Sequence, residues 1–381
     1  MGMANLTEEL PRILHLAESA QGGVGTYLAE ILPDQLRRYG VDHVRALVPE
    51  QHAAHLGGVD RRVLTTWRRQ ERSAIGIIGF AAAMRAEMRR FRPTIVHAHS
   101  SIAGGVVRLM SHWTRSPYRI VYCPHGWAFD RQGMPIKNSL IEWIERGLAP
   151  GASRIVLISE HERQEAVRIG IASERLSLIL NGIGDLPTAY AAKWLDPRLK
   201  VLFVGRLGQQ KGFDTFLDAV APIAAQVAVR VIGTAVAGPH AEQPRRPGIE
   251  YLGWRSLAEV ATEIAAADVV VMPSRWEGFG LVALEAMRGG RAVLASAVGG
   301  LREIVVDGVT GRLVPPDHPA QLMQALIAHD RTTWREMGAA GRVRYETRFT
   351  AERMNRELAE LYAGLQRVRE PAGSLTRVAH A

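Results

Sequence analysis

Short apolar runs alternate with helical stretches along almost all of the 381-residue chain. Runs such as "KVLFVG" and "DVVVMPS" are nearly continuously apolar, which is typical of parallel strands covered on both faces. Helices between such strands form right-handed βαβ units. Ten strands are predicted in two series, at residues 12–17, 41–48, 94–99, 119–123, 154–159 and 176–180, and then at 200–205, 227–233, 268–274 and 292–296.

The two series are separated by residues 182–200, which contain two prolines and no clean period and are typical of a linker. The chain is long enough for two domains. We therefore predict an α/β protein with two Rossmann-like parallel-sheet domains, 1–185 and 186–350, facing a central cleft. A helix at about 352–369 is expected to pack back on the first domain, and residues 370–381 are expected to be a disordered tail.

The amino terminus has no basic leader followed by an apolar core, so no signal peptide is expected. No apolar run approaches the length of a membrane span. A single cysteine, Cys123, excludes an intramolecular disulfide and is expected to be a small buried residue on a strand. These features predict a cytoplasmic protein, with peripheral attachment to the inner face of the cytoplasmic membrane as an option.

The net charge of +9 is concentrated in one segment, residues 61–92, which holds nine arginines and two glutamates. Its middle, residues 73–84, is apolar. A basic amphipathic helix of this kind can lie on anionic lipid. The alternative is an ordinary helix that packs on a sheet and keeps its arginines in water, and the sequence leaves both interpretations open.

The stretch "SRWEGFGLVALEAMRGG" carries two carboxylates on a predicted strand–loop–helix unit, with the helix at 281–288. Glu277 lies in the loop and Glu285 in the helix. Gly278 and Gly280 allow a ligand to approach the backbone, and the helix start suits a phosphate. Since carboxylates accept hydrogen bonds from hydroxyls, this unit could hold a sugar at Glu277, a diphosphate at the helix start and a ribose at Glu285. The alternative is a capped helix with two solvated acids.

A second strand–loop–helix unit, "VGRLGQQKGFDTFLDAV", places Arg206 and Lys211 on either side of its loop. Two cations five residues apart can clamp a diphosphate without a metal. Either cation alone would be interpreted as part of a solvated basic loop. The chain has no Asp-x-Asp motif, so we expect no metal requirement.

The first domain offers weaker candidates. Gly22 and Gly23 lie in a turn between a strand and a helix, but the dinucleotide pattern G-x-G-x-x-G is missing, which argues against an NAD enzyme. His99 ends one further predicted strand and Ser100 follows it, whereas His125 follows another, and ligands bind beyond the carboxyl ends of strands in such sheets. A lone histidine is nevertheless more often structural than catalytic.

"EGFGLVALEAMRGG" resembles the E-x7-E signature of the retaining family 4 glycosyltransferases, which have the GT-B fold. Glu277 matches the first acid and Glu285 the second. Residues 292–319 resemble the same family almost without a gap, whereas the first domain does so more loosely. "HSSIAGG" and "PHGWAF" are similar to the subgroup that builds exopolysaccharide, capsule or related cell-envelope glycans.

The resemblance implies transfer of a sugar from a nucleotide-diphosphate donor to a saccharide or lipid-linked saccharide acceptor, with retention and without a required cofactor. Catalytic roles fall on His125, Glu277, Arg206 and Lys211. The donor side comprises Gly22, Gly23, Gly205, Arg206, Lys211, Gly233, Glu277, Phe279, Gly280, Leu281 and Glu285, and the acceptor side His99 and Ser100. The loop at 233–248 departs from the family pattern, so UDP-sugar and GDP-sugar both stay possible, with residues 251–256 expected beside the base.

Three alternatives belong to other classes. A 2-epimerase-like nucleotide-sugar isomerase would share the fold, but those proteins lack the E-x7-E context. A nucleic-acid-binding protein would suit the charge, but no recognised module is visible and the arginines alternate with aliphatic rather than aromatic residues. A catalytically inactive partner is disfavoured because all the motif residues are present. We therefore expect no nucleic-acid partner.

Overall fold

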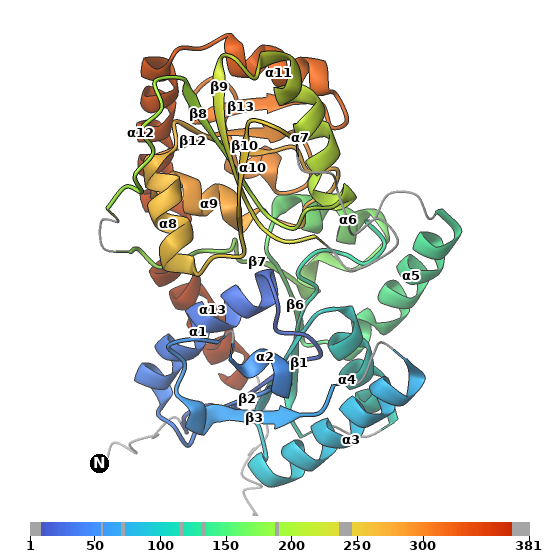
Figure 1. Ribbon diagram of the computed structural model, residues 1–381. Helices are drawn as coiled ribbons and strands as arrows, with labels where there is room; N and C mark the ends of the chain where they lie inside the picture. Colours follow the sequence, from blue (N-terminus) through green and yellow to red (C-terminus); the bar gives the residue numbers. More distant parts are fainter. Residues whose placement is uncertain are drawn as a thin grey trace, which may run out of the picture.

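The computed structural model describes residues 9–54, 56–69, 73–113, 117–130, 135–186, 190–235 and 246–367. The predicted tail at 370–381, most of the loop at 233–248 and Arg72 lie outside the described residues. The described chain forms two α/β lobes, one above the other (Figure 1).

The N-terminal lobe is built on a seven-stranded parallel sheet in the order β3-β2-β1-β4-β5-β6-β7. Its strands are β1 (Ile13–Ala17), β2 (Val44–Pro49), β3 (Leu64–Trp67), β4 (Ile95–His99), β5 (Arg119–Cys123), β6 (Arg154–Leu157) and β7 (Leu176–Leu178). Its helices are α1 (Gly23–Tyr39), α2 (Glu50–Ala53), α3 (Ala74–Phe91), α4 (Ser101–Trp113), α5 (Pro135–Leu148) and α6 (Glu160–Arg168), with 3₁₀ turns η1 (Arg61–Val63), η2 (Ala149–Gly151) and η3 (Ser173–Arg175).

The C-terminal lobe is built on a six-stranded parallel sheet in the order β10-β9-β8-β11-β12-β13. Its strands are β8 (Leu199–Val204), β9 (Val227–Ile232), β10 (Ile249–Gly253), β11 (Val269–Met272), β12 (Ala292–Ser296) and β13 (Gly311–Val314). Its helices are α7 (Phe213–Val220), α8 (Leu257–Ala266), α9 (Leu281–Arg288), α10 (Leu301–Ile304), α11 (Pro319–Ile327) and α12 (Arg331–Arg348), with 3₁₀ turns η4 (Gln209–Lys211) and η5 (Ala221–Ile223).

The predicted fold class is confirmed, and each of the ten predicted strands is present. The sequence interpretation missed β3, β10 and β13, which all lie at sheet edges. Edge strands are covered less completely than central ones, and these three contain several half-buried or exposed residues. Their apolar runs are therefore broken, and the pattern of a central parallel strand is lost.

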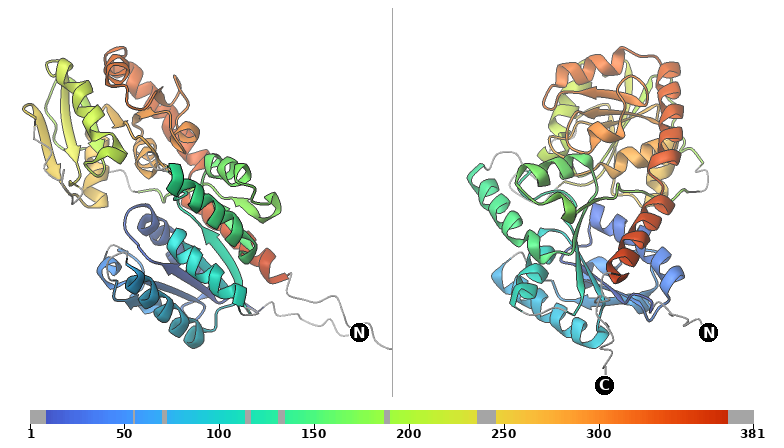
Figure 2. Two further views of the ribbon diagram at one scale, coloured as in Figure 1. Left: turned by 90° about the vertical axis from the view of Figure 1, so that its right-hand side faces the viewer. Right: turned by 180° about the vertical axis from the view of Figure 1, so that it is seen from behind.

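The last helix, α13 (Ala351–Arg367), leaves the C-terminal lobe and lies along the N-terminal lobe, where it packs on α1 (Figure 2). The Tyr362 hydroxyl lies 2.7 Å from Nδ1 of His97 on β4, and the Arg353 guanidinium donates to the Leu180 carbonyl at 2.6 Å. The predicted division at 185/186 falls between β7 and β8 and stays a prediction.

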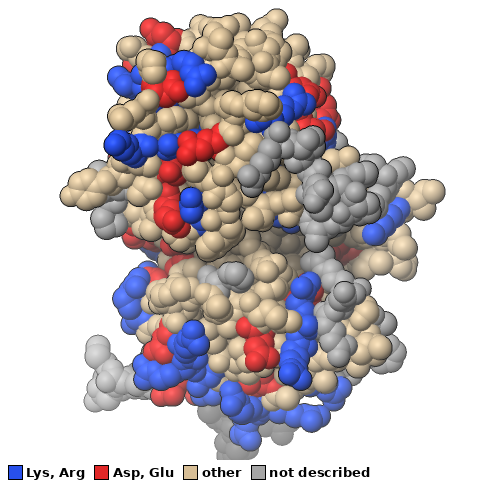
Figure 3. Space-filling view, viewed as in Figure 1, with Lys and Arg blue, Asp and Glu red and all other residues tan. Residues whose placement is uncertain are grey.

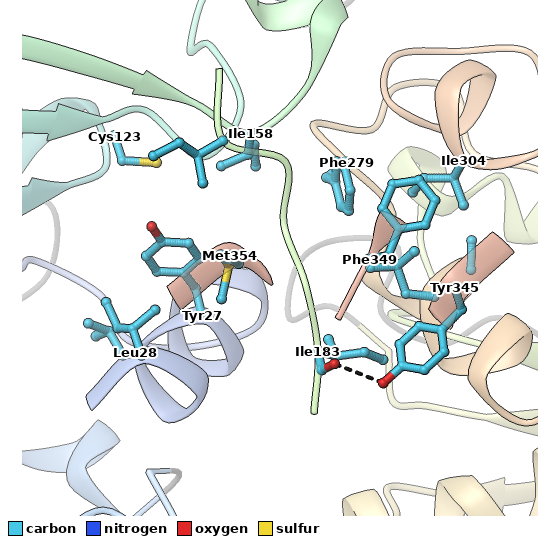
Figure 4. Close-up of a cluster of buried hydrophobic side chains, with 14 of the residues drawn as sticks. Tyr27, Leu28, Cys123, Ile158, Ile183, Phe279, Ile304, Tyr345, Phe349 and Met354 are labelled. Carbon is cyan, nitrogen blue, oxygen red and sulfur yellow. Dashed lines mark hydrogen bonds between the residues drawn. The ribbon is translucent and has the colours of Figure 1, made fainter. Parts of the chain in front are cut away.

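One buried apolar cluster contains residues of both lobes. Figure 4 shows Tyr27 and Cys123 of the N-terminal lobe on one side of the connecting segment, and Phe279 and Phe349 on the other. In that segment, the Ile183 carbonyl accepts a hydrogen bond from the Tyr345 hydroxyl at 2.9 Å. The lobes therefore share a packed junction. Cys123 is buried on β5, as predicted.

Candidate active site

The loop between β11 and α9 is held between two neighbouring turns that approach it closely. A Cβ added at Gly212 would lie 1.8 Å from the carbonyl oxygen of Pro273, and one added at Gly299 would lie 1.8 Å from that of Glu277. Both glycines also have left-handed φ angles, +60° and +45°. Any side chain at either position would clash with the backbone of the loop, so the loop that carries Glu277 can lie this close to both turns only because these residues are glycines.

Glu277 and Lys211 form an ion pair across the loops that follow β11 and β8. Their side chains are only 13% and 17% exposed. The Ser274 hydroxyl lies 3.4 Å from the same carboxylate oxygen. The structure thus brings together two predicted site residues that are 66 positions apart, as a neutral pair that a charged ligand could reorganise.

The other predicted donor residues of this lobe lie around the pair. Arg206 is exposed and donates to the Gln210 side chain at 2.7 Å. Gly205 and Gly233 have φ angles of +154° and +145°, and a Cβ on Gly233 would lie 1.8 Å from the Gly205 carbonyl oxygen. The ends of β8 and β9 are therefore in close backbone contact beside the Lys211 loop.

Glu285 is half-buried on α9. Its pKa is raised to about 7, chiefly by desolvation; the Glu30 carboxylate of the other lobe also raises it, whereas Arg288 and Lys211 lower it. The Arg288 guanidinium donates to the Gly184 carbonyl at 2.8 Å. A carboxyl group that titrates near neutrality can both donate and accept hydrogen bonds, which suits binding to a diol.

Two turns of the N-terminal lobe contact these loops. A Cβ added at Gly23 would lie 3.8 Å from Cδ1 of Leu281, and one added at Gly126 would lie 3.5 Å from Cα of Gly278. Gly22 precedes α1 with a φ of +61°. The predicted residues after β1 and β5 therefore face the loop after β11, at the carboxyl ends of both sheets.

His125 has a left-handed φ of +54°. This turn is held by Glu162, a residue that the sequence interpretation missed. The Glu162 carboxylate accepts from the backbone N–H of Gly126 at 2.5 Å and of Ile158 at 3.0 Å. Burial raises the pKa of Glu162 to about 8 and lowers that of His125 to about 3. Only the helix-start pattern Ser-x-x-Glu at Ser159 hinted at Glu162.

A second missed carboxylate, Glu303 on α10, reaches the other lobe. It accepts from the backbone N–H groups of Glu160 and His161 at the start of α6, both at 2.7 Å. These groups have no helical acceptor and carry part of the helix dipole, so a carboxylate stabilises them. No motif pointed to this contact.

The predicted acceptor-side residues lie at the end of β4. His99 is fully buried, and its Nδ1 lies 3.0 Å from Nε2 of His125. Ser100 has a φ of +81° and donates its N–H to the Cys123 carbonyl at 2.9 Å. His99 is thus connected to the cleft through His125.

His15, His97 and His99 form a buried group in which each ring offers one nitrogen, and these three nitrogens lie within 4.8 Å of one another, close enough to hold a metal ion. Burial lowers the pKa of His15 to about 4 and those of the other two well below the usual value. All three are therefore neutral near pH 7, the form that binds metals or shares hydrogen bonds.

A cavity of about 540 Å³ lies at the amino ends of β5 to β7, against α13. Its lining includes Arg119, Arg154 and Arg175. It shares no residue with the group around Glu277. It lies at the amino ends of the strands, whereas the candidate active site lies at their carboxyl ends, so the two are separate.

The chain matches two protein-family models, "Glycosyl transferase 4-like domain" over residues 22–182 and "Glycosyl transferases group 1" over residues 198–329. It is 36% identical over 306 residues to a D-inositol 3-phosphate glycosyltransferase of Streptosporangium roseum, covering 72% of this chain and 70% of the relative. It is 26% identical to an uncharacterized 41.2 kDa protein in cps region of Klebsiella pneumoniae, covering 92% and 99%.

The fold is similar to that of Anabaena HepE in complex with UDP-glucose, with a TM-score of 0.74, 21% identity and coverage of 92% and 99%. No described helix combines the length and apolar character needed to cross a bilayer. A glycosyltransferase family model thus matches each of the two lobes. The chain belongs to the glycosyltransferases of the GT-B fold, with a glycosyl transferase 4-like domain followed by a group 1 domain.

Proposed function

We propose that this glycosyltransferase moves a sugar from a nucleoside-diphosphate donor to a saccharide or lipid-linked saccharide acceptor with retention at the anomeric carbon. The observation that carries the proposal is the Lys211–Glu277 pair at the carboxyl ends of β8 and β11, opposite the His125 turn. Such a site joins a cation for a diphosphate with an acceptor for sugar hydroxyls.

Leaving-group stabilisation is the main electrostatic task of the proposed reaction, because the transition state resembles an oxocarbenium ion departing from a diphosphate. Lys211 would turn from Glu277 to the diphosphate, and Arg206 would bind it from the solvent side. The backbone N–H groups at the start of α9, next to Gly280, would bind a phosphate oxygen. In this proposal these groups stabilise the negative charge of the departing diphosphate, and no step is assigned to a metal.

The two carboxylates would bind one donor at different points. Glu277, released from Lys211, would accept from sugar hydroxyls, and Glu285 would bind the ribose. His125 would face the sugar. Double displacement at a glycosidic centre needs two carboxylates about 5 Å apart across the scissile bond, and we do not assign Glu277 and Glu285 to such a pair. The UDP-glucose in HepE makes UDP-sugars the first donors to test, with GDP-sugars next.

Transfer assays on Lys211→Ala and Glu277→Ala test the proposed roles. Each should lower kcat/KM by at least about 10- to 100-fold, the effect expected from losing one charge-assisted hydrogen bond. Lys137→Ala, on α5 of the other lobe, is the matched control and should behave as wild type. Normal transfer by a folded Lys211→Ala or Glu277→Ala protein would refute the assignment.

A second candidate function is the isomerase suggested by the shared fold. Incubation of the protein with UDP- and GDP-sugars in the absence of an acceptor separates the two. Conversion of the donor to an epimer would favour the isomerase, whereas unchanged donor that is consumed only when a saccharide acceptor is added would favour transfer.

The proposed acceptor lipid suggests a cytoplasmic enzyme at the inner membrane surface, acting in exopolysaccharide or cell-envelope glycan synthesis. Residues 61–92 support this in part. α3 packs on the sheet through buried Phe80 and Met84, as in the ordinary-helix interpretation, but Ile75 and Ile78 at its start are 69% and 68% exposed. Lys and Arg side chains gather over this lobe (Figure 3).

Some of these arginines are already paired: Arg62 with Asp60, and Arg69 with Glu18. The exposed isoleucines are therefore the sharper test of membrane binding. Ile75→Ser/Ile78→Ser should reduce flotation with vesicles of anionic phospholipid, because apolar burial at the bilayer surface is lost. Unchanged flotation of that double variant would remove residues 61–92 as the binding surface.

A further inference from the structure

Four side chains form a continuous row of hydrogen bonds from the core of the N-terminal lobe to its cleft. The Gln35 amide oxygen lies 2.7 Å from Nε2 of His15, Nδ1 of His15 lies 3.0 Å from Nε2 of His99, and Nδ1 of His99 lies 3.0 Å from Nε2 of His125. Gln35, His15 and His99 are buried, whereas His125 is partly exposed. The row therefore ends at the proposed reaction centre.

The sheet register explains how these residues meet. β1 and β4 are neighbours, with Ala17 opposite His99, and β4 pairs with β5, with His99 opposite Cys123. His15 lies two residues before Ala17, so it projects from the same face of the sheet as His99. This face is covered by α1, which carries Gln35. His125 lies two residues beyond the end of β5, so the row runs across three adjacent strands toward their carboxyl ends.

The protonation of the row is set at its inner end. Each neutral imidazole has one N–H and one lone pair, so the direction of one hydrogen bond dictates the direction of the next. The Gln35 amide oxygen can only accept, so Nε2 of His15 donates to it. His15 then accepts from Nε2–H of His99, and His99 accepts from Nε2–H of His125. Nδ1 of His125 is left with a lone pair and has no partner among the described residues.

We propose that Gln35, acting through His15 and His99, fixes His125 in the tautomer whose Nδ1 offers a lone pair to a sugar hydroxyl in the cleft. This proposal rests on the function proposed above. Gln35, His15 and His99 are positioning residues, since they act only through His125. Burial keeps the row neutral near pH 7, because it lowers the pKa of His15 to about 4 and that of His125 to about 3.

His15 and His99 could instead hold a metal ion together with His97. The contacts favour the hydrogen-bonded row, because Nδ1 of His15 and Nε2 of His99 already face each other at hydrogen-bond distance. The three residues include no carboxylate or thiolate, so a divalent ion in this buried place would lack a compensating charge. Metal content is therefore one outcome of the test.

NMR of protein labelled with ¹⁵N-histidine measures the tautomer directly, since protonated and unprotonated ring nitrogens resonate far apart. We expect wild-type His125 to be neutral between about pH 6 and 8, with the proton on Nε2. Gln35→Met, which keeps the volume but loses the acceptor, should give mixed tautomers, and Gln35→Glu, which keeps an acceptor oxygen, should restore Nε2–H. Tyr27→Phe, on the same helix and beside the His125 ring, is the control and should keep the wild-type tautomer.

Transfer assays link the tautomer to function. In Gln35→Met, kcat should fall roughly fivefold, the effect of about one neutral hydrogen bond. In Gln35→Glu, kcat should return toward the wild-type value. The tautomer needs no substrate, so absence of glycosyl transfer would count against the proposed function and not against the row. The proposal is overturned if wild-type His125 carries its proton on Nδ1, if purified protein contains a stoichiometric metal ion that His15→Gln removes, or if Gln35→Met alters the tautomer without altering kcat.

Discussion

Replacement of Glu303 should loosen the contact between the two lobes. Its carboxylate accepts hydrogen bonds from the first two backbone N–H groups of α6, those of Glu160 and His161, both at 2.7 Å. Glu303→Ala removes both hydrogen bonds and the charge that complements the helix start. Both N–H groups can then be solvated only if the lobes separate or water enters between them.

The magnitude follows from the two bonds. A hydrogen bond to a charged group contributes about 1.5–3 kcal/mol, but water replaces part of that when the lobes separate, so we expect a net cost of about 2–4 kcal/mol for the pair. Since about 1.4 kcal/mol changes an equilibrium tenfold, the ratio of associated to separated lobes should fall by roughly 30-fold to several hundred-fold. Glu303→Gln keeps one acceptor oxygen without the charge and should lose about half of this free energy.

Small-angle X-ray scattering measures the resulting expansion, and calorimetry measures the weakening of UDP or GDP binding, because a donor held by both lobes must first bring them together. Glu336→Ala is the matched control, since it removes an exposed acid of α12 in the same lobe. An unchanged radius of gyration together with unchanged nucleotide affinity in Glu303→Ala would refute this reasoning.

The other predictions concern buried charges. Because burial raises the folded pKa of Glu162 from 4.5 to about 8, the folded chain keeps a proton that the unfolded chain has lost, and its free energy of unfolding should fall as pH rises toward 8. In Glu162→Gln, the free energy of unfolding should fall less with pH above about pH 6.5, where unfolded histidines no longer titrate. Urea unfolding at several pH values measures this dependence, and the same slope against pH in the variant and the wild type would contradict the idea. Glu145→Ala removes the partner of the fully buried Arg108, 2.7 Å away, and should cost about 3–5 kcal/mol. Arg108→Met/Glu145→Leu should cost much less, and equal losses in the single and double variants would contradict the account.

The central strands and the Lys211–Glu277 neighbourhood could be predicted because both depend on patterns that the sequence displays. Buried parallel strands are continuous apolar runs, and the loops that carry the two residues follow strands that pair in the sheet. Residues at the carboxyl ends of paired strands must lie close together, so two motifs distant in sequence predict one site.

Other features could not be predicted, for physical reasons. Glu162 and Glu303 bind backbone N–H groups, which every residue except proline has, so no sequence pattern marks their partners. The row from Gln35 to His125 depends on the register between β1 and β4 and on which face α1 covers. A histidine in a buried strand has the same sequence context whether it is structural, ligating or positioning.

The central claim is that Lys211 and Glu277 form the donor site between the two lobes, and a crystal structure of the protein with UDP or GDP tests it most directly. The account predicts a diphosphate within hydrogen-bond distance of the Lys211 ammonium and of the backbone N–H groups at the start of α9, with the ribose at Glu285. A nucleotide bound away from Arg206, Lys211 and residues 277–285 would contradict it.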